Sequence, residues 1–316
     1  MKPKNILVFG ATGQIGRNLV RKLTKKNYKV TAVTRNLHQK GYILKTQANP
    51  GYIDIVEANI FDTNKLQEIV SNCDICINLI GILYEKGANS FKNIHTNFPS
   101  ILSDLCFKKN IEQFIHVSAL GIETAVKSNY AKSKLDGENE LKKNFPKALI
   151  LRPSLVYSVD DNFTTLFMSL INIIPFFPLY YKGRTKFSPI HCSDMTEIIL
   201  TMVEKKVNSQ IVECIGPEQL TFKEIVINLL NSINKNRPLI SVPLFMAKFL
   251  AFFFELFPKP LLTKDQLRLL KHDNIASGKY KTNFDFDIPS VLIFRNEVDK
   301  YSFMWRERGQ FSKFNS

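Results

Sequence analysis

The glycine turn near the N-terminus most constrains what this chain can fold into. An apolar run, Ile6 to Phe9, is typical of a buried parallel strand, and a helical pattern of apolar residues follows it. Between them Gly10, Gly13 and Gly16 follow the spacing G-x-x-G-x-x-G. At such a corner one glycine permits the tight turn, one lets a pyrophosphate approach the backbone, and one lets helix and strand pack closely. The pattern predicts a dinucleotide site with its phosphates at the helix N-terminus, and a plain turn is the alternative.

Strand and helix patterns alternate along the first half of the chain. After the first strand, we expect further strands at 29–34, 52–57, 74–80, 113–117 and 148–151. We expect helices between them at 63–72, 90–109 and 130–141. Strands and helices that alternate at this spacing predict an α/β fold with a Rossmann-type doubly wound parallel sheet and right-handed crossovers.

The second half of the chain is expected to be mainly helical. A capping box at 221–224 begins one helix, and a terminal helix is expected at 289–311. We therefore expect a Rossmann domain at 1–155, to which later segments return, and a smaller C-terminal lobe at 156–316. Substrate, partner or membrane would contact this lobe.

The end of the second predicted strand bears on which dinucleotide would bind. A site that prefers NAD usually carries an acid about 20 residues beyond the glycines, where it holds the ribose 2′-hydroxyl. Here Arg35 follows the strand, and a guanidinium can pair with a 2′-phosphate through charge-assisted hydrogen bonds. Arg35 therefore favours NADP(H), with NAD(H) as a second possibility and Lys40 as a weaker candidate. The alternative is a solvated basic loop.

Other residues of the expected cofactor site belong to the glycine turn and to the ends of the predicted strands. The stretch after the third strand could line the adenine, and a small residue after the fourth lets the backbone pass the cofactor. These additional residues are Thr12, Gln14, Ile15, Asn59, Ile60, Leu79, Ile80 and Gly81.

A second motif, Tyr130-Ala-Lys-Ser-Lys134, lies on a predicted helix after the fifth strand. Tyrosine and lysine four residues apart lie on one helical face. The lysine charge, with a nicotinamide ribose, can lower the pKa of the phenol so that it exchanges a proton with a substrate hydroxyl or carbonyl. Ser118, at the carboxyl end of the strand, could polarise the same oxygen. The sequence therefore predicts Tyr130, Lys134 and Ser118 as catalytic and cofactor-binding residues, although Y-x-x-x-K by itself is common in a lysine-rich chain.

Composition and charge exclude several classes of protein. The net charge of +15 would suit nucleic acid or an anionic membrane surface. The lysines are scattered and no zinc-finger or RNA-binding signature is present, so we expect no nucleic-acid partner. Cys73 and Cys76 form a C-x-x-C beside an apolar strand without a second pair, so we expect core residues and no metal site. No signal peptide precedes the first strand, which predicts a cytoplasmic or matrix-like location.

The segment from Pro243 to Phe257 is unusually apolar, with aromatic residues on nearly all faces of about four helical turns. At roughly 22 Å it is shorter than a bilayer core of about 30 Å. Such a helix either packs in the core of the lobe or presents an exposed patch to a membrane or partner.

The glycine triplet, Ser118 and the Tyr130–Lys134 pair resemble those of extended or atypical short-chain dehydrogenase/reductases of the NAD-dependent epimerase/dehydratase type. A narrower likeness, from about residue 4 to about residue 310, is to the thirty-nine-kilodalton NAD(P)H-binding accessory subunits of respiratory complex I and their bacterial relatives. The phrases that carry it are NLIGILYE at 78–85, HVSALG at 116–121, LILRPS at 149–154, GPEQLT at 216–221 and LTKDQLRLL at 262–270.

This resemblance implies a bound NADPH with a structural role and no established turnover, in complex I or another quinone-linked respiratory system. It also implies a place for Pro153 beside the nicotinamide, and a location in the cytoplasm or peripherally on the inner face of the cytoplasmic membrane, which is the matrix side in a mitochondrion. Contact with anionic membrane would accompany that location.

Two departures from the family pattern bear on catalysis. Ser118 precedes Tyr130 by only 12 residues, fewer than in family members that act on nucleotide sugars. The asparagine of the family's catalytic tetrad is replaced by His95 or displaced to Asn97. We therefore expect an NADP(H)-binding accessory or regulatory protein. The alternative is an active NADP-dependent reductase or epimerase that uses Tyr130 and Lys134.

Overall fold

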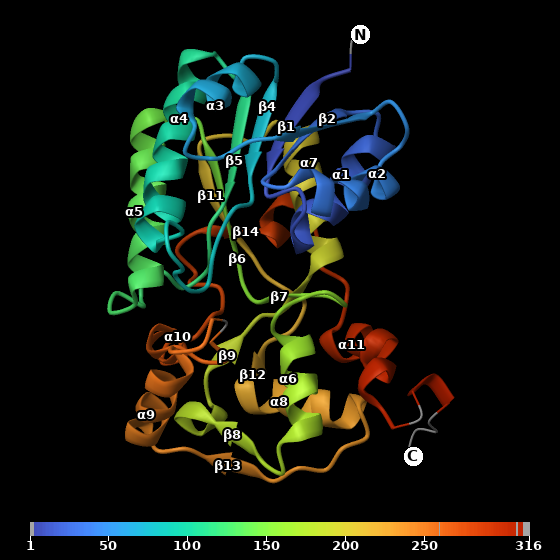
Figure 1. Ribbon diagram of the computed structural model, residues 1–316, viewed down its shortest axis with the longest axis vertical. Helices are drawn as coiled ribbons and strands as arrows, with labels where there is room; N and C mark the ends of the chain where they lie inside the picture. Colours follow the sequence, from blue (N-terminus) through green and yellow to red (C-terminus); the bar gives the residue numbers. More distant parts are fainter. Residues whose placement is uncertain (1–2, 259, 308, 312–316) are drawn as a thin grey trace.

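An eight-stranded, wholly parallel sheet forms the upper part of the molecule in Figure 1. The computed structural model describes residues 3–258, 260–307 and 309–311. The strand order is β14-β11-β6-β5-β4-β1-β2-β3. The strands are β1 (Asn5–Phe9), β2 (Lys29–Thr34), β3 (Ile53–Glu57), β4 (Ile75–Asn78), β5 (Gln113–Val117), β6 (Leu149–Pro153), β11 (Gln210–Cys214) and β14 (Lys281–Thr282).

Helices cover both faces of this sheet, which is why its central strands are apolar on both sides. On one face Ile6 and Val8 pack with residues of α1 (Gln14–Lys25), α2 (Tyr42–Gln47) and α7 (Cys192–Glu204). On the other face Leu7 and Phe9 pack with residues of α3 (Thr63–Val70), α4 (Phe98–Lys108) and α5 (Asn129–Asn144). Figure 1 shows these two helical layers on opposite sides of the strands. The predicted doubly wound sheet is confirmed.

Two strands of the sheet come from the second half of the chain. β11 pairs with β6, with Ile211 opposite Ile150, and β14 pairs with β11 in turn. The sheet is therefore assembled from segments that lie far apart in the sequence.

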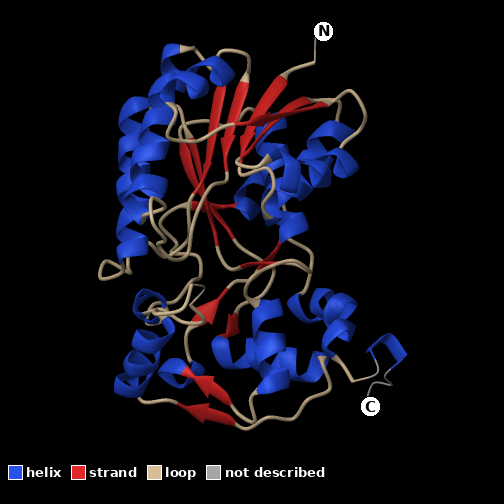
Figure 2. Ribbon diagram, in the orientation of Figure 1, coloured by secondary structure: helices blue, strands red, loops and turns tan. Residues whose placement is uncertain are grey.

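A second core lies below the sheet and is built by residues after about 150. Tyr157, Phe222 and Phe294 are among its largest buried side chains. The segments that surround it, here called the C-terminal lobe, carry short strands and most of the remaining helices (Figure 2). Its elements are α6 (Thr164–Ile173), β8 (Phe177–Leu179), β9 (Lys186–Phe187), β12 (Leu220–Thr221), α8 (Phe222–Ser232), β13 (Leu239–Ser241), α9 (Leu244–Phe254), α10 (Lys264–Leu269) and α11 (Phe294–Ser302). The expected capping box starts α8.

Three predicted element boundaries were wrong. The fourth strand ends at Asn78, because its side chain accepts a hydrogen bond from the backbone N–H of Ile80 and turns the chain out of the sheet. The predicted helix at 90–109 begins instead as a π-helical turn, η2 (Lys92–Asn97), before α4. The expected terminal helix is helical only from Phe294 to Ser302 and is followed by short 3-10 turns; residue 308, within its predicted span, lies outside the described residues.

The described residues contain neither a membrane-spanning helix nor a cluster of metal ligands. None of their helices is both long enough and apolar enough to cross a bilayer. No group of three or more His, Cys, Asp or Glu among them could hold a metal ion. Cys76 is buried in β4 and Cys73 is half-buried beside it, both as free thiols whose pKa burial raises.

Candidate functional site

The glycine turn between β1 and α1 has the geometry of a phosphate cradle. Gly10 has a φ of +80°, in the left-handed region that favours glycine. The N–H of Gly13 donates to the carbonyl of Gly10 at 3.0 Å, which closes the turn. A Cβ on Gly16 would lie only 2.2 Å from that carbonyl oxygen, so the helix can approach the strand only because this residue has no side chain. Gly13 itself is exposed and leaves the backbone open to a ligand.

The N-terminus of α1 is ready to accept an anion. Its N-cap, Gly13, provides no side-chain cap, and the first turn has no acidic residue. The N–H groups and the positive end of the helix dipole therefore remain for phosphate oxygens. Thr12 and Ile15 are half-buried at this turn, and Gln14 donates to the hydroxyl of Ser158 at 2.9 Å. The residues present fit a dinucleotide pyrophosphate.

The ends of β2 and β3 bring two further predicted residues close together. The N–H of Ala58 donates to the carbonyl of Thr34 at 3.0 Å, so Arg35 and Asn59 follow neighbouring strand ends. Arg35 is exposed and forms no ion pair with any residue that the structure describes. The side chain of Asn59 accepts from the N–H of Phe61, whereas that of Ile60 is buried in the core. Of these, Arg35 is the side chain best placed for a solvent-side ligand.

The chain after β4 connects the glycine turn with α5, the helix that carries Lys134. The N–H of Leu79 donates to the carbonyl of Phe9 at 3.0 Å, and a Cβ on Gly10 would lie 3.2 Å from the carbonyl carbon of Leu79. Two residues later, a Cβ on Gly81 would lie 3.3 Å from the Nζ of Lys134. The two sequence motifs, far apart in the chain, therefore meet across Leu79, Ile80 and Gly81.

Lys134 is buried at the end of β5. Its Nζ donates to the carbonyl of Val117 at 3.2 Å. Burial lowers the pKa of Lys134 to about 8, although the carboxylate of Glu138 acts in the opposite direction. Ser118, which follows Val117 in the chain, is buried, and its hydroxyl has no hydrogen-bond partner within the described part of the chain. Buried hydroxyls normally have a hydrogen-bond partner. The Ser118 hydroxyl, next along the chain from the carbonyl that Lys134 binds, is therefore suited to an oxygen atom of a ligand.

Tyr130 lies in the same site, beside His95. Its ring makes edge contacts with Phe91 and His95, at centroid distances of 5.8 and 5.2 Å. Burial raises the pKa of the Tyr130 phenol to about 12. Without a nucleotide, removal of the phenol from water dominates this pKa; its lowering by Lys134 together with a nicotinamide ribose stays a prediction.

His95 is the tetrad replacement that faces the site. Its Nε2 accepts from the N–H of Ile82 at 3.0 Å, so the proton lies on Nδ1, which donates to the hydroxyl of Ser133 at 2.9 Å. Burial and the neighbouring ammonium of Lys134 lower its pKa to about 2. Asn97, the other candidate, is exposed and donates to Asn93 instead.

A buried His116–Asn78 pair was not predicted as part of the site. The two side chains lie 3.1 Å apart, Asn78 Nδ2 to His116 Nδ1, across β4 and β5. Burial, followed by the charge of Lys134, lowers the pKa of His116. The amide can only donate, so Nδ1 accepts and Nε2 carries the proton, without a partner among the described residues. The available signal was Asn78 at the end of an apolar β4 and His116 in β5, where Gln113 is a second polar residue.

Protein contacts fill the corner after β6. Pro153 is buried, and its carbonyl accepts from the N–H of Leu120 at 2.9 Å. The hydroxyl of Ser154 lies 2.7 Å from the side-chain oxygen of Asn274, so it holds a later loop in place. Ser154 is therefore occupied by protein contacts.

This site corresponds to a known family. The model of the NAD dependent epimerase/dehydratase family matches residues 6–214. The chain belongs to this family. The match covers the glycine turn, the Ser118 position and the Tyr130–Lys134 pair, which confirms the resemblance that those motifs indicated.

The most similar relatives of this epimerase/dehydratase chain include two mitochondrial subunits. One is the NADH-ubiquinone oxidoreductase 40 kDa subunit of Neurospora crassa, 27% identical over 89% of this chain and 74% of that protein. The other is the NADH dehydrogenase (ubiquinone) 1 alpha subcomplex subunit 9 of Dictyostelium discoideum, 31% identical over 69% of this chain and 61% of that protein. Among solved structures, a UDP-glucuronic acid 4-epimerase from Bacillus cereus in complex with UDP-glucuronic acid and NAD superposes with a TM-score of 0.71. It is 17% identical and covers 95% of this chain and 99% of its own, which shows a shared fold.

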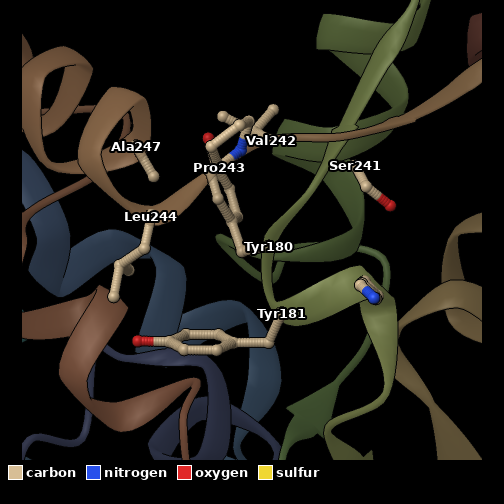
Figure 3. Close-up of a pocket in the computed structure, with 8 residues that line it drawn as sticks. Tyr180, Tyr181, Ser241, Val242, Pro243, Leu244 and Ala247 are labelled. Atoms are coloured by element: carbon tan, nitrogen blue, oxygen red, sulfur yellow. The ribbon is translucent and has the colours of Figure 1, made fainter.

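Two hollows of this family member lie outside the glycine turn. A groove of about 410 Å³ is lined by Phe91 and Asn129 on the side of the sheet and by Phe257, Thr263 and Asp265 from the lobe, among others. Since Phe91 touches the Tyr130 ring, this groove adjoins the predicted catalytic residues. A second hollow, of about 290 Å³, lies between η3 (Tyr180–Gly183) and the start of α9 (Figure 3), and no predicted site residue lines it.

Proposed function

We propose that this protein is an NADP(H)-binding accessory or regulatory protein of complex I (NADH:ubiquinone oxidoreductase) or of another quinone-linked respiratory system. The observation that carries the proposal is the similarity, over 89% of the chain, to a protein named as a 40 kDa subunit of NADH-ubiquinone oxidoreductase. The intact cradle from Gly10 to Gly16 supports retention of a nucleotide.

Each part of the site has a role in this proposal. The N–H groups at the start of α1 bind the pyrophosphate, and Arg35 pairs with the 2′-phosphate of NADP(H). Thr12, Gln14 and Ile15 line the turn, and the adenine lies by Asn59 and the backbone of Ile60. The nicotinamide half lies along Leu79, Ile80, Gly81 and Pro153, with Lys134 and Tyr130 toward its ribose.

A second candidate function is that of an NADP-dependent reductase or epimerase. The unpartnered hydroxyl of Ser118 favours it, because a structural residue would be expected to have its hydrogen bond satisfied. Tyr130 would then transfer a proton to or from the substrate oxygen, Lys134 would stabilise the phenolate, and Ser118 would hold the oxygen. The nicotinamide, when bound, would supply or accept the hydride.

We further propose a location in the cytoplasm, or peripherally on the inner face of the cytoplasmic membrane, which is the matrix side in a mitochondrion. Residues 1–155 would supply the cofactor site, and 156–316 the surface for partner, substrate or anionic membrane. Nucleic acid is not expected as a partner.

Purification without added nucleotide tests the first proposal. We expect NADPH to co-purify in about equimolar amount and the protein to co-migrate with complex I, and a Tyr130→Phe variant to support respiration normally. Absence of both bound nucleotide and NADP(H) affinity contradicts both candidate functions. A respiratory defect in Tyr130→Phe with normal NADPH retention favours the enzyme.

Replacement of Arg35 by Asp tests the cofactor preference. The carboxylate would repel the 2′-phosphate and could accept a bond from a ribose 2′-hydroxyl, so we expect NADPH affinity to fall about tenfold or more while NADH affinity rises. Lys40→Asp makes the same charge change five residues further along and should have a smaller effect. Titration of both nucleotides by fluorescence measures this, and unchanged selectivity in Arg35→Asp removes this residue from the role.

A further inference from the structure

Helix α9 (Leu244–Phe254) turns its smallest residues inward and its largest outward. Ala247 and Ala251, one helical turn apart, are 1% and 0% exposed and pack with Leu262 and Leu267. The opposite side carries Phe245, Phe249, Phe252 and Leu256, which are 72%, 64%, 49% and 71% exposed. Residues at this spacing lie along one face of a helix.

This orientation is the reverse of an ordinary surface helix. Such a helix buries its large apolar side chains and exposes its polar ones. Here further large residues extend the exposed face on α9 and just beyond it: Met246, Phe253, Phe257 and Leu261. The outward face, as a continuous apolar surface, is of the kind that marks contact with a membrane or another molecule. We call this set of eight exposed residues the α9 face.

Two lysines, Lys248 and Lys264, border the α9 face, Lys264 in an ion pair with Glu255, and none of the eight members of the face is charged. Residues 244–271 contain five Lys or Arg and two Asp or Glu. Lys248 is exposed on α9 itself, and the Nζ of Lys264 lies 4.4 Å from the ring centroid of Phe252. Apolar and aromatic residues bordered by lysines are the composition of helices that lie in the interface of an anionic bilayer.

The position of α9 suits such a contact. Figure 1 shows the helix at the outer edge of the lobe, at the opposite end of the molecule from the N-terminus. Eleven residues make a helix of about 16 Å, which is too short to cross the bilayer core and long enough to lie along its surface. The hollow in Figure 3 lies on the inward side of α9, where Leu244 and Ala247 border it, and is not part of the α9 face.

We propose that the α9 face docks on an anionic phospholipid bilayer, with the helix parallel to the membrane surface and its phenylalanines among the acyl chains near the headgroups. The net charge of +15 favours a negatively charged surface as the occupant over an uncharged one. The inference rests on the proposed function only for the expectation that the protein works at a membrane. To the proposed function it adds the part of the protein that binds, the α9 face, and the class of lipid that is bound, anionic phospholipid.

Vesicle flotation of the purified full-length protein tests this surface. We expect binding to vesicles of phosphatidylcholine with phosphatidylglycerol, and weak binding to phosphatidylcholine alone. The double variant Phe245→Gln, Phe249→Gln should bind the anionic vesicles at least tenfold more weakly. Both side chains are exposed, so the fold should be retained. Phe107→Gln is the control, since Phe107 is 59% exposed on α4, away from the lobe.

Insertion of the face can be measured directly with Phe249→Trp. We expect its fluorescence to shift to shorter wavelength with anionic vesicles and to be quenched by brominated acyl chains. Three outcomes would overturn the proposal: no vesicle binding by the wild type, equal binding by the double variant, or loss of complex I association by the double variant when the wild type does not bind vesicles. The last would identify a protein interface. NADPH retention, measured in the same samples, reports on the cofactor site alone, so either proposal can fail without the other.

Discussion

Three basic side chains share one buried site, and only one of them can hold a charge. His95 and His116 both lie close enough to Lys134 for its ammonium to lower their pKa, and burial adds to the effect. His95 instead uses both ring nitrogens in neutral hydrogen bonds, to Ile82 and Ser133, and His116 uses Nδ1 in one to Asn78. The site therefore concentrates its single positive charge at the lysine, where an anionic ligand or a phenolate would meet it.

Because these histidines are neutral in the folded protein, we expect the free energy of unfolding to decrease in mild acid. The pKa of His95 is about 2 in the fold and about 6.5 when unfolded, so below pH 6.5 the unfolded chain binds a proton that the native one does not. Stability from this group is complete above pH 6.5 and declines as the pH falls. At pH 5 the loss should be about 2 kcal/mol for this histidine. His95→Asn should reduce the pH dependence of the unfolding free energy, measured with urea at pH 7 and 5. His38→Asn, at an exposed position, should leave it unchanged.

A wild-type unfolding free energy that is the same at both pH values would contradict the neutral-imidazole assignment. So would a His95→Asn variant with the full wild-type pH dependence, because the proton in question would then bind elsewhere.

At the scale of elements, the glycines of the turn from β1 to α1 differ in how much space surrounds them for a side chain. Gly16→Ala would place a methyl group 2.2 Å from the carbonyl oxygen of Gly10, against backbone that cannot move aside. At Gly13 a Cβ would meet the same oxygen at 3.3 Å, and φ is ordinary. We expect Gly16→Ala to cost several kcal/mol of unfolding free energy and to abolish nucleotide binding. Gly13→Ala should fold with at most a small loss.

Thermal unfolding and NADPH titration of the two variants measure the difference. Equal stability of Gly16→Ala and Gly13→Ala would show that α1 can shift away from the strand, contrary to the close packing described for Gly16.

The helix that carries Tyr130 and Lys134 is capped from another part of the chain. Asp265 of α10 accepts hydrogen bonds from the N–H groups of Asn129 and Tyr130, at 2.8 and 3.0 Å, and from the hydroxyl of Ser128 at 2.7 Å. Since α10 also packs against α9, Asp265 joins the start of α5 to the part of the lobe that carries α9.

Asp265→Ala should therefore affect both stability and the site. Loss of a helix cap costs about 0.5–2 kcal/mol, and we expect NADPH affinity to fall as the start of α5 loosens. Asp62→Ala removes a cap of the same kind from α3, where Asp62 accepts from the N–H of Lys65, away from Tyr130. It should lower the unfolding free energy similarly and leave NADPH affinity unchanged. Equal affinities in both variants would separate the Asp265 cap from the cofactor site.

At the scale of the whole molecule, the sheet depends on chain beyond residue 155. β11 pairs with β6 along five residues, and α7 covers the face of the sheet shared with α1. Buried Arg152 of β6 bonds to Glu123, whose carboxylate also accepts from Tyr280 at 2.6 Å. A fragment of residues 1–155 would keep the Arg152–Glu123 pair but lose β11, α7 and the Tyr280 bond, and would expose the apolar face beneath α7.

We expect the 1–155 fragment to unfold without a cooperative transition and to bind NADPH poorly, while the full chain unfolds cooperatively. Circular dichroism during heating and dispersion of amide signals in NMR spectra measure this. A fragment with a sharp transition and dispersed signals would show that the first half is a self-sufficient domain.

The sequence by itself determined the features that depend on neighbours along the chain. The glycine turn, the alternation of strands and helices and the capping box at Thr221 are set by backbone sterics, periodicity and short-range hydrogen bonds, so they could be predicted. The family followed from the same motifs, because the match includes the turn and the Tyr130–Lys134 pair.

The tertiary structure alone decided what depends on burial and on contacts between distant segments. It selected His95 over Asn97, paired His116 with Asn78, and brought Asp265 to the start of α5. Sequence reasoning expected Lys134, together with a nicotinamide ribose, to lower the pKa of Tyr130; in the protein without a nucleotide, desolvation, which no local pattern reports, raises it. For the same reason, the sequence did not decide whether the apolar segment at 243–257 packs in the core or lies exposed at the surface. Only packing shows that its alanines and Phe254 face the protein and that its other phenylalanines face outward.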